Sequence, residues 1–370
     1  MRQHKSGALL IVFAFIFTLL GLTQSLSLDI STMTPHIHSL SLIAGLCLLI
    51  TVIYSCFVAI QFKHVLVIQL FTFVSAFFVL KAAYQVTDNT IMLWFNVIAL
   101  VLLANLSLKY LVEQQQQTIP QLLIATLFGF WCLYAWQFIV TVLQVPQVLL
   151  PTPTAILQAL TGSGAMLWAD FVQTVIKSVV IGYLLGNGLG ILSAILIERS
   201  SFLQRGFLPL ANLTSTIPLV GVAPIAVMWF GFDWPSKAAV IVLVTYFPAL
   251  VSTLAGLQST NKLEQELMYS YAASYWLTLK MLRLPAAMPF IFNALKVNSA
   301  LALITAIVAE YFGSPTVGLG FRISVEAARM HMPVVWSAIV VASISGSVIY
   351  ALLVYLERRV TFWHPAIRKA

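Results

Sequence analysis

The chain has 370 residues, of which 61% are hydrophobic and only 8% are charged. Because soluble domains usually carry about 25% charged residues, this composition excludes a water-soluble globular protein. The formal net charge of +8 fits a membrane protein, whose Lys and Arg residues collect in cytoplasmic loops, so nucleic-acid binding is not expected.

Apolar runs of about 20 residues, the length that crosses a bilayer as a helix, recur along the chain. They lack the period-two alternation of barrel strands, so the sequence predicts an all-α polytopic membrane protein with about ten transmembrane helices. The first run follows a charged N-terminus, but it exceeds a signal-peptide core and no cleavage site follows it, so we expect a retained span. The predicted spans are 7–27, 39–61, 64–82, 91–112, 120–143, 172–197, 207–230, 237–257, 289–311 and 335–356.

The basic residues predict the orientation of these spans. An even number of spans puts both termini on one side of the membrane. With the termini in the cytoplasm, thirteen Lys and Arg residues lie inside and four lie outside, which is the expected bias. We therefore predict a multi-pass protein of the cell (inner or plasma) membrane with both termini cytoplasmic. The four outer residues are Lys81, Lys237, Arg322 and Arg329.

A polar linker, "EQQQQTIPQ", follows the fourth span. It predicts two parts: 1–115, a four-helix membrane region of unknown role, and 116–370, which holds the other six spans. Two connections on the predicted outer side, 145–170 and 311–333, contain Pro and Gly residues beside amphipathic turns. These connections are either short helices along the membrane face or ordinary loops.

A long connection on the predicted cytoplasmic side, "EQELMYSYAASYWLTLKMLRLPAAMP" (264–289), mixes charged and aromatic residues. Leu263, Leu267, Tyr271 and Trp276 are too apolar for a freely solvated loop. Such a mixed surface suggests a docking site for a soluble partner. The alternative is that the loop packs against its own helix bundle.

Polar and kinked positions inside the spans are candidates for the transport path. A proline removes a helix hydrogen bond, and the resulting kink either lines a path, acts as a hinge or stays static. Ionisable groups inside a membrane are costly and often functional, although Glu310 could instead pair structurally with Arg322 or Lys177. The candidates are Pro218, Pro224, Asn293, Lys296, Asn298 and Glu310.

Residue patterns for catalysis and metal binding are weak. His36 and His38 lie one residue apart on an outer loop but lack a third ligand nearby, so no metal site is expected. The string "GNGLG" lacks the strand and the lysine of a nucleotide loop, and its glycines fit close helix packing instead. Without a catalytic triad, paired carboxylates or a P-loop, the chain is not expected to be an enzyme or to hydrolyse ATP.

The loop 264–289 resembles the cytoplasmic signature of the membrane-spanning permeases of binding-protein-dependent ABC importers. That signature is Glu-Ala-Ala, three residues, Gly, and a fixed spacer to Leu-Pro. Aligned on Leu284-Pro285, it places Glu on Glu266, the two Ala on Leu267 and Met268, and Gly on Ala272. Glu and Leu-Pro match, whereas the middle of the motif departs from the pattern.

Five further segments, in the expected order, are similar to the nitrate, sulfonate and taurine branch of this family, and the resemblance covers about residues 125–365. The four N-terminal spans lie outside it. The segments are "LLPTPTAIL" (149–157), "KSVVIGYLLGNGLGILSAI" (177–195), the Pro-rich stretch 217–259 with its Trp-Phe-Gly turn, "IVAEYFGSPTVGLGF" (307–321) and "LERRVTFWHP" (356–365).

The resemblance implies a type I importer-like six-helix core and a cytoplasmic coupling loop at about 258–288, which would bind an ABC ATPase. It also implies an extracytoplasmic substrate-binding protein, a second permease copy, as a homodimer in membrane lipid, and ATP and Mg on the ATPase, with no cofactor on this chain. The substrate would be a small solute: nitrate, a sulfonate, taurine or a pyrimidine-type precursor. The alternative is a stand-alone secondary transporter or channel. The implied coupling residues are Glu266, Leu267, Met268, Tyr269, Ala272, Leu284 and Pro285.

Overall fold

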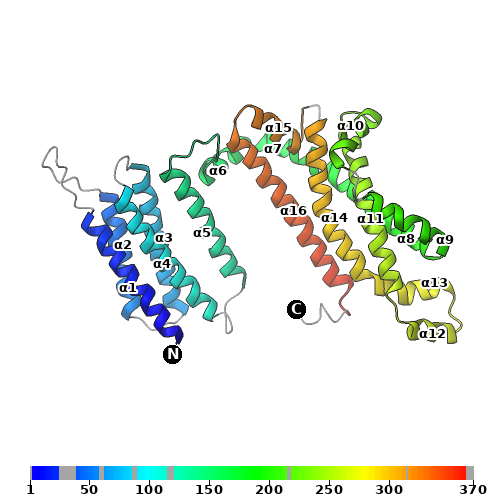
Figure 1. The fold of residues 1–370 in the computed structure, drawn as a ribbon, viewed down its shortest axis with the longest axis horizontal. Coiled ribbons are helices and arrows are strands. Elements are labelled where there is room, and N and C mark those ends of the chain that lie inside the picture. The colour runs from blue at the N-terminus through cyan, green and yellow to red at the C-terminus, as the bar shows by residue number, and fades with distance from the viewer. Residues whose placement is uncertain are drawn as a thin grey trace. The chain divides into compact units, whose positions relative to one another are not determined.

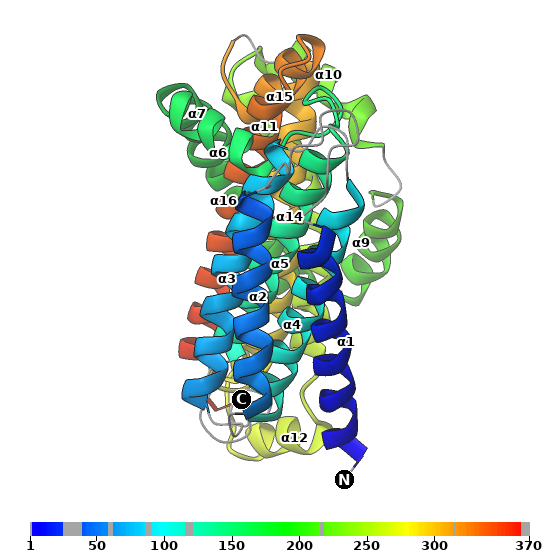
Figure 2. The ribbon, with the colours of Figure 1, turned by 90° about the vertical axis from the view of Figure 1, so that its left-hand side faces the viewer.

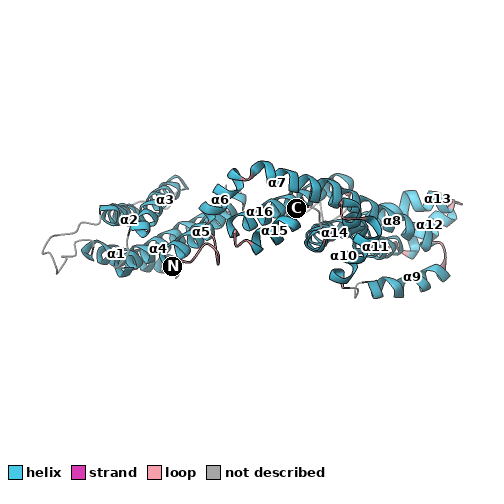
Figure 3. Ribbon diagram, turned by 90° about the horizontal axis from the view of Figure 1, so that it is seen from above, coloured by secondary structure: helices cyan, strands magenta, loops and turns pink. Residues whose placement is uncertain are grey.

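The computed structural model describes residues 2–24, 39–57, 62–85, 90–114, 121–214, 218–313 and 316–363. Helices make up almost all of these ranges, which contain no β-strand (Figures 1 and 3). Within them, seven helices are long and apolar enough to cross a membrane, and three shorter apolar segments, Leu10–Leu22, Leu42–Ser55 and Gly221–Phe230, accompany them. Each of the ten overlaps a predicted span, which confirms the all-α polytopic architecture.

The chain forms two compact units, Met1–Thr154 and Ala155–Ala370. The fifth helix groups with the four that precede it, whereas the sequence places a domain boundary near residue 115. The boundary near residue 115, which is drawn from the polar linker, stays a prediction.

The first unit packs through small residues. Ala14, Ala76 and Ala99 are almost fully buried among Leu and Val side chains, and small residues let helices approach closely in lipid. The Tyr134 hydroxyl donates to the Ala76 carbonyl oxygen at 2.9 Å and so ties the fifth helix to the third. The helices are α1 (Arg2–Gln24), α2 (Ser39–Phe57), α3 (Phe62–Gln85), α4 (Thr90–Gln114) and α5 (Gln121–Val142).

The second unit is built around three long helices, α8, α11 and α14, with α16 beside α14 (Figure 1). The bounds in this unit are α6 (Pro153–Gly162), α7 (Gly164–Phe171), the π-helix η1 (Val172–Val180), α8 (Ile181–Glu198), α9 (Ser201–Thr214), α10 (Leu219–Phe230), α11 (Trp234–Gln258), α12 (Lys262–Ser270), α13 (Tyr275–Thr278), the π-helix η2 (Leu279–Arg283), α14 (Leu284–Phe312), α15 (Leu319–Ala328) and α16 (Met332–Val360).

Three glycines on one face of α8 explain how closely it packs on α11. A Cβ atom at Gly186 would lie 2.0 Å from Thr245 Oγ1, and one at Gly190 would lie 2.5 Å from the Tyr246 carbonyl oxygen. A Cβ at Gly182 would lie 2.8 Å from the Ile241 side chain and 2.9 Å from the Ala238 carbonyl oxygen. A Cβ at Gly188 would meet no atom within 4 Å, so this glycine of the "GNGLG" string does not serve the packing.

The two ends of the second unit differ. Helices α7, α10 and α15 lie at one end, the α15 end, whereas α12 and α13 lie at the other, the α12 end (Figures 1 and 2). The segments 145–170 and 311–333 thus contain short helices: α6 and α7 in the first, α15 in the second. The last turn of α16 lies at the α12 end (Figure 1).

Two details differ from the sequence prediction. The span predicted at 207–230 is not one helix: α9 ends at Thr214, and α10 begins after Pro218, whose backbone is extended. Proline explains this, because it lacks the amide hydrogen that a continuous helix needs. In addition, Lys237 does not lie in a loop: it is a fully buried residue of α11.

Candidate functional site

The connection between α11 and α14 carries the residues predicted for coupling, and its first helix is capped locally. The Asn261 side chain accepts a hydrogen bond from the Leu263 amide at 3.4 Å, and the Glu264 carboxylate accepts one from the Asn261 amide at 3.3 Å. This capping box lets nine residues form α12 although none of them is buried.

The turn after α12 is a Schellman motif centred on Ala272. The Ala272 amide donates to the Tyr269 carbonyl at 2.9 Å, and the Ala273 amide donates to the Met268 carbonyl at 3.0 Å. Ala272 has φ 52°, the left-handed conformation that such a turn requires and that glycine adopts most readily. The residue aligned with the signature glycine therefore has the backbone conformation that favours glycine.

The outward face of this connection, here called the docking face, is aromatic and exposed. Tyr269 is 87% exposed, Tyr271 78% and Trp276 63%. Leu263 and Leu267 are also exposed, and Glu266 lies on the surface beside them. Large apolar groups at a water-exposed helix end are costly unless a partner covers them.

The inward side of the connection is held by Glu198, the last residue of α8. Its carboxylate forms an ion pair with Arg283 and accepts a hydrogen bond from the Tyr275 hydroxyl at 2.7 Å. Below these polar contacts, Leu279 packs with Leu257 and Ala287. Leu284 and Pro285 are half-buried at the start of α14. The connection is therefore firmly attached to the bundle while its docking face stays free.

Two predicted pathway residues on α14 are engaged in contacts with other helices. Lys296 forms an ion pair with Glu357 of α16 at 2.9 Å. The Asn298 amide donates to Asn187 Oδ1 at 2.7 Å and to the Thr245 carbonyl at 2.8 Å. Asn298 is fully buried. In this conformation Lys296 and Asn298 therefore join α14 to neighbouring helices.

Glu310 is also buried and partnered. Its carboxylate accepts hydrogen bonds from the Thr174 hydroxyl at 2.9 Å and from the Gly320 amide at 2.9 Å. It pairs with neither Arg322 nor Lys177 within ion-pair distance: Arg322 instead contacts Asp170 at 2.8 Å. Glu310 therefore holds the first turn of α15.

The other pathway candidates are exposed. Asn293 lies on the open face of α14, and Pro218 and Pro224 lie on exposed positions at the start and middle of α10. The contacts of Glu198 and Asn187 and the buried role of Lys237 were not predicted from the sequence. The Lys237 ammonium group donates to the Phe232 and Gly313 carbonyl oxygens. Asn187 sits inside a glycine-rich apolar run, which is the one signal that could have singled it out.

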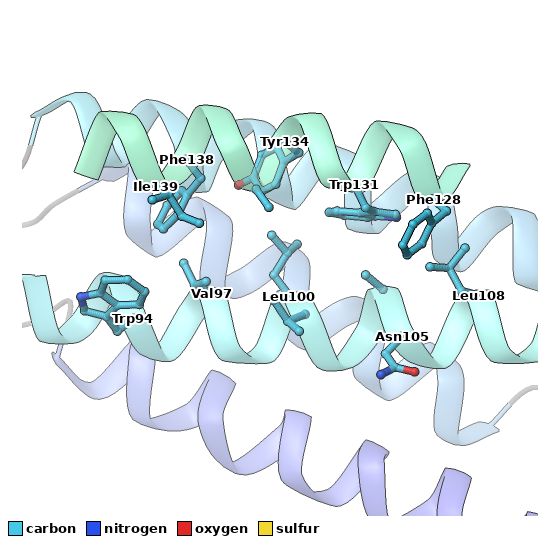
Figure 4. Close-up of a pocket in the computed structure, with 13 residues that line it drawn as sticks. Trp94, Val97, Leu100, Asn105, Leu108, Phe128, Trp131, Tyr134, Phe138 and Ile139 are labelled. Carbon is cyan, nitrogen blue, oxygen red and sulfur yellow. The ribbon is translucent and has the colours of Figure 1, made fainter. Parts of the chain in front are cut away.

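The first unit contains an apolar groove between α4 and α5 (Figure 4). Its volume is about 460 Å³, and Trp94, Trp131 and Phe138 line it together with aliphatic side chains. Within the ranges that the structure describes, no three His, Cys, Asp or Glu residues are close enough to hold a metal ion. His36 and His38 lie outside those ranges.

Comparison with known proteins gives a consistent result. The family model of the binding-protein-dependent transport system inner membrane component matches residues 186–362. The formylaminopyrimidine transport permease protein ThiX of Halalkalibacterium halodurans is 32% identical over 243 residues, which cover 66% of this chain and 96% of ThiX. The riboflavin transport system permease protein RibX of Chloroflexus aurantiacus is 28% identical (62% and 86% covered), and the taurine transport system permease protein TauC of Escherichia coli is 27% identical (64% and 88% covered).

The apolar helices of the described ranges, seven of them long enough to cross a membrane, define a polytopic membrane protein, and its α11–α14 connection exposes an aromatic face. The chain belongs to the family of binding-protein-dependent transport system inner membrane components. It is the transmembrane subunit of an ATP-driven importer and works with an ABC ATPase and a substrate-binding protein. Permeases of this family are not enzymes, because hydrolysis takes place on separate subunits, and a stand-alone transporter or channel is not supported.

Proposed function

We propose that the connection at about residues 258–288, which includes Leu284 and Pro285 at the start of α14, is the coupling element that binds the ABC ATPase. The observation that carries this proposal is the exposed docking face on a locally capped helix that is fixed to α8. Glu266, Leu267, Met268, Tyr269 and Ala272 form its first half. A short helix held this way transmits a rigid-body motion to the spans that it joins.

The proposed orientation puts the docking face and both chain termini in the cytoplasm. The excess of basic residues on that side supports it, as does the position of the last turn of α16 at the α12 end. ATP and Mg would bind to the ATPase, and this chain would hold no cofactor.

A second permease copy, in membrane lipid, would complete the pathway. Exposed apolar side chains on α10 and α14, namely Met228, Trp229 and Ile304, support this part of the proposal. Asn293, Pro218 and Pro224 are exposed in the same unit and would line the path, whereas Lys296, Asn298 and Glu310 would have to exchange partners for it to open.

The proposed substrate is a small solute of the kind that the relatives are named for. Those names specify a formylaminopyrimidine, riboflavin and taurine, and nitrate and alkanesulfonates belong to the same predicted group. The substrate-binding protein makes the choice among them, so the direct measurement is uptake of each radiolabelled solute by proteoliposomes that contain the permease, its ATPase and that binding protein.

Co-purification tests the docking assignment. The tagged chain is expressed with its ATPase, as wild type and as the double variant Glu266→Arg with Ala272→Trp. We expect the wild type to retain the ATPase and the double variant to lose it while eluting as a monodisperse, folded protein. Met330→Arg, a matched change at an exposed residue of the α15 end, should retain it.

Two results would overturn the proposal. Equal recovery of the ATPase with the double variant would show that the docking face is not its binding site. Loss of the ATPase with Met330→Arg alone would show that the partner binds at the α15 end instead.

A further inference from the structure

The carboxylate of Glu198 joins three parts of the second unit, namely α8, α13 and η2. It pairs with Arg283 at the end of η2 and accepts the Tyr275 hydroxyl from α13. The Arg199 guanidinium lies over the Tyr275 ring, 5.6 Å from its centroid. Both carboxylate oxygens are therefore used by groups from the α11–α14 connection.

Arg283 extends the junction to α12. Its second terminal nitrogen donates to Gln265 Oε1 at 3.3 Å, and the Gln265 amide donates to the Thr260 hydroxyl at 2.8 Å. The docking face and the end of α11 are thus linked through side chains to the last turn of α8.

The Glu198 backbone is also connected to the end of α11, through Gln204 of α9. The Gln204 amide donates to the Glu198 carbonyl at 2.8 Å, and the Gln258 amide donates to Gln204 Oε1 at 3.1 Å. Along its length α8 packs closely on α11, since Gly186 and Gly190 leave no room for a Cβ atom between the two helices. A displacement at the docking face is therefore delivered to α8 and α11 together.

We propose that Glu198 is a positioning residue that transmits movement of the ATPase from the docking face to α8. The assignment rests on the proposed function of the coupling element. An ion pair with hydrogen bonds in fixed directions suits this role because it resists both twisting and sliding. The Glu198 and Arg283 side chains are only 11% and 20% exposed, so water screens the pair less than a surface pair.

The test uses proteoliposomes that contain the permease, its ATPase and the binding protein. Four permeases are compared: wild type, Glu198→Gln, Arg283→Gln, and the charge-exchanged variant Glu198→Arg with Arg283→Glu. The readout is solute transported per ATP hydrolysed. For the single variants we expect this ratio to fall about tenfold, a size typical of coupling residues, while ATPase co-purification stays within twofold of wild type. The exchanged variant should recover part of the ratio.

Two controls keep the result interpretable. Tyr275→Phe removes one hydrogen bond to Glu198 but leaves the ring. It should lower the transport-to-hydrolysis ratio by less than the charge variants do, and it serves as the test if those variants misfold. Arg322→Gln removes a comparably buried ion pair, with Asp170, at the α15 end, and should lower the thermal midpoint without changing the ratio.

An unchanged ratio in all three Glu198 and Arg283 variants would overturn the proposal, as would an equal fall with Arg322→Gln. Failure of the proposed function looks different, because the Glu266→Arg with Ala272→Trp variant would then retain the ATPase as well as the wild type does.

Discussion

Asn298 of α14 donates from its amide nitrogen to Asn187 Oδ1 of α8 at 2.7 Å, and the same nitrogen donates to the Thr245 carbonyl of α11. Asn187 in turn donates to the Tyr183 carbonyl, and the Tyr183 hydroxyl donates to the Leu295 carbonyl. One buried amide therefore joins the three central helices of the permease unit.

Replacing Asn298 with Ala should destabilise this junction. Interhelical hydrogen bonds in membrane proteins contribute about 0.6 kcal/mol on average and at most about 1.7 kcal/mol. With two bonds lost and a cavity left, we expect a loss of about 1–3 kcal/mol. Thermal unfolding in detergent measures the change. Asn293→Ala, at an exposed site on the same helix, should leave the midpoint unchanged, and equal midpoints for both variants would refute the junction.

Gly186→Ala and Gly188→Ala should behave oppositely. The first methyl group would collide with Thr245 and with the α11 backbone, whereas the second meets open space. We expect Gly186→Ala to cost roughly 1–3 kcal/mol, the usual penalty for overpacking, and Gly188→Ala to be neutral or slightly stabilising, because alanine favours helix by about 1 kcal/mol over glycine. Thermal midpoints of the purified variants decide this, and similar losses in both would contradict close α8–α11 packing.

Ala272→Gly should be tolerated, whereas Ala272→Val should not. A β-branched residue with positive φ is a strained outlier, and glycine adopts this conformation without penalty. We expect the glycine variant to transport at least as well as wild type and the valine variant to bind less ATPase. Ala273→Val, next to this turn and without a positive φ, is the matched control. Normal ATPase binding by Ala272→Val would show that the turn does not shape the docking face.

The Lys296–Glu357 pair predicts non-additive mutations. Lys296→Met leaves a carboxylate unpaired between α14 and α16, and removal of one partner of a buried pair costs up to about 3–5 kcal/mol. Adding Glu357→Gln replaces the unpaired carboxylate with a neutral amide, and the double variant should recover most of the thermal stability. A double variant that is less stable than Lys296→Met would show that the pair is not an isolated ionic contact.

Asp233, just before α11, provides a pH test. A hydrogen bond from the Gln173 amide, at 2.6 Å, and one from the Trp234 amide lower the pKa of this carboxyl below its ordinary value of 3.8. A lowered folded-state pKa gives stability that is present above the unfolded-state pKa and disappears as the pH falls through the folded-state pKa. The midpoint difference between wild type and Asp233→Asn should thus be constant from pH 5 to pH 8 and change only in stronger acid. A difference that varies across the neutral range would assign the titration to another group.

The amino-acid sequence by itself determined the class of this protein. Membrane-length apolar runs depend on composition and length alone, because lipid requires every spanning segment to satisfy its own backbone hydrogen bonds. For the same reason the positions of the apolar helices were predictable without knowledge of their packing. The loop from Glu266 to Leu284-Pro285 was also visible, since its residue types differ so sharply from the spans around it.

Tertiary structure alone decided which polar residues meet. Glu198 and Arg283 lie 85 residues apart, and nothing local in the sequence says that α8 ends beside η2. The same holds for Asn187 and Asn298, and for Glu310, whose partners are Thr174 and Gly320 rather than Arg322. Partner choice depends on the rotation and depth of each helix, which are set by side-chain packing between helices. The periodicity of a uniformly apolar span carries little of that information.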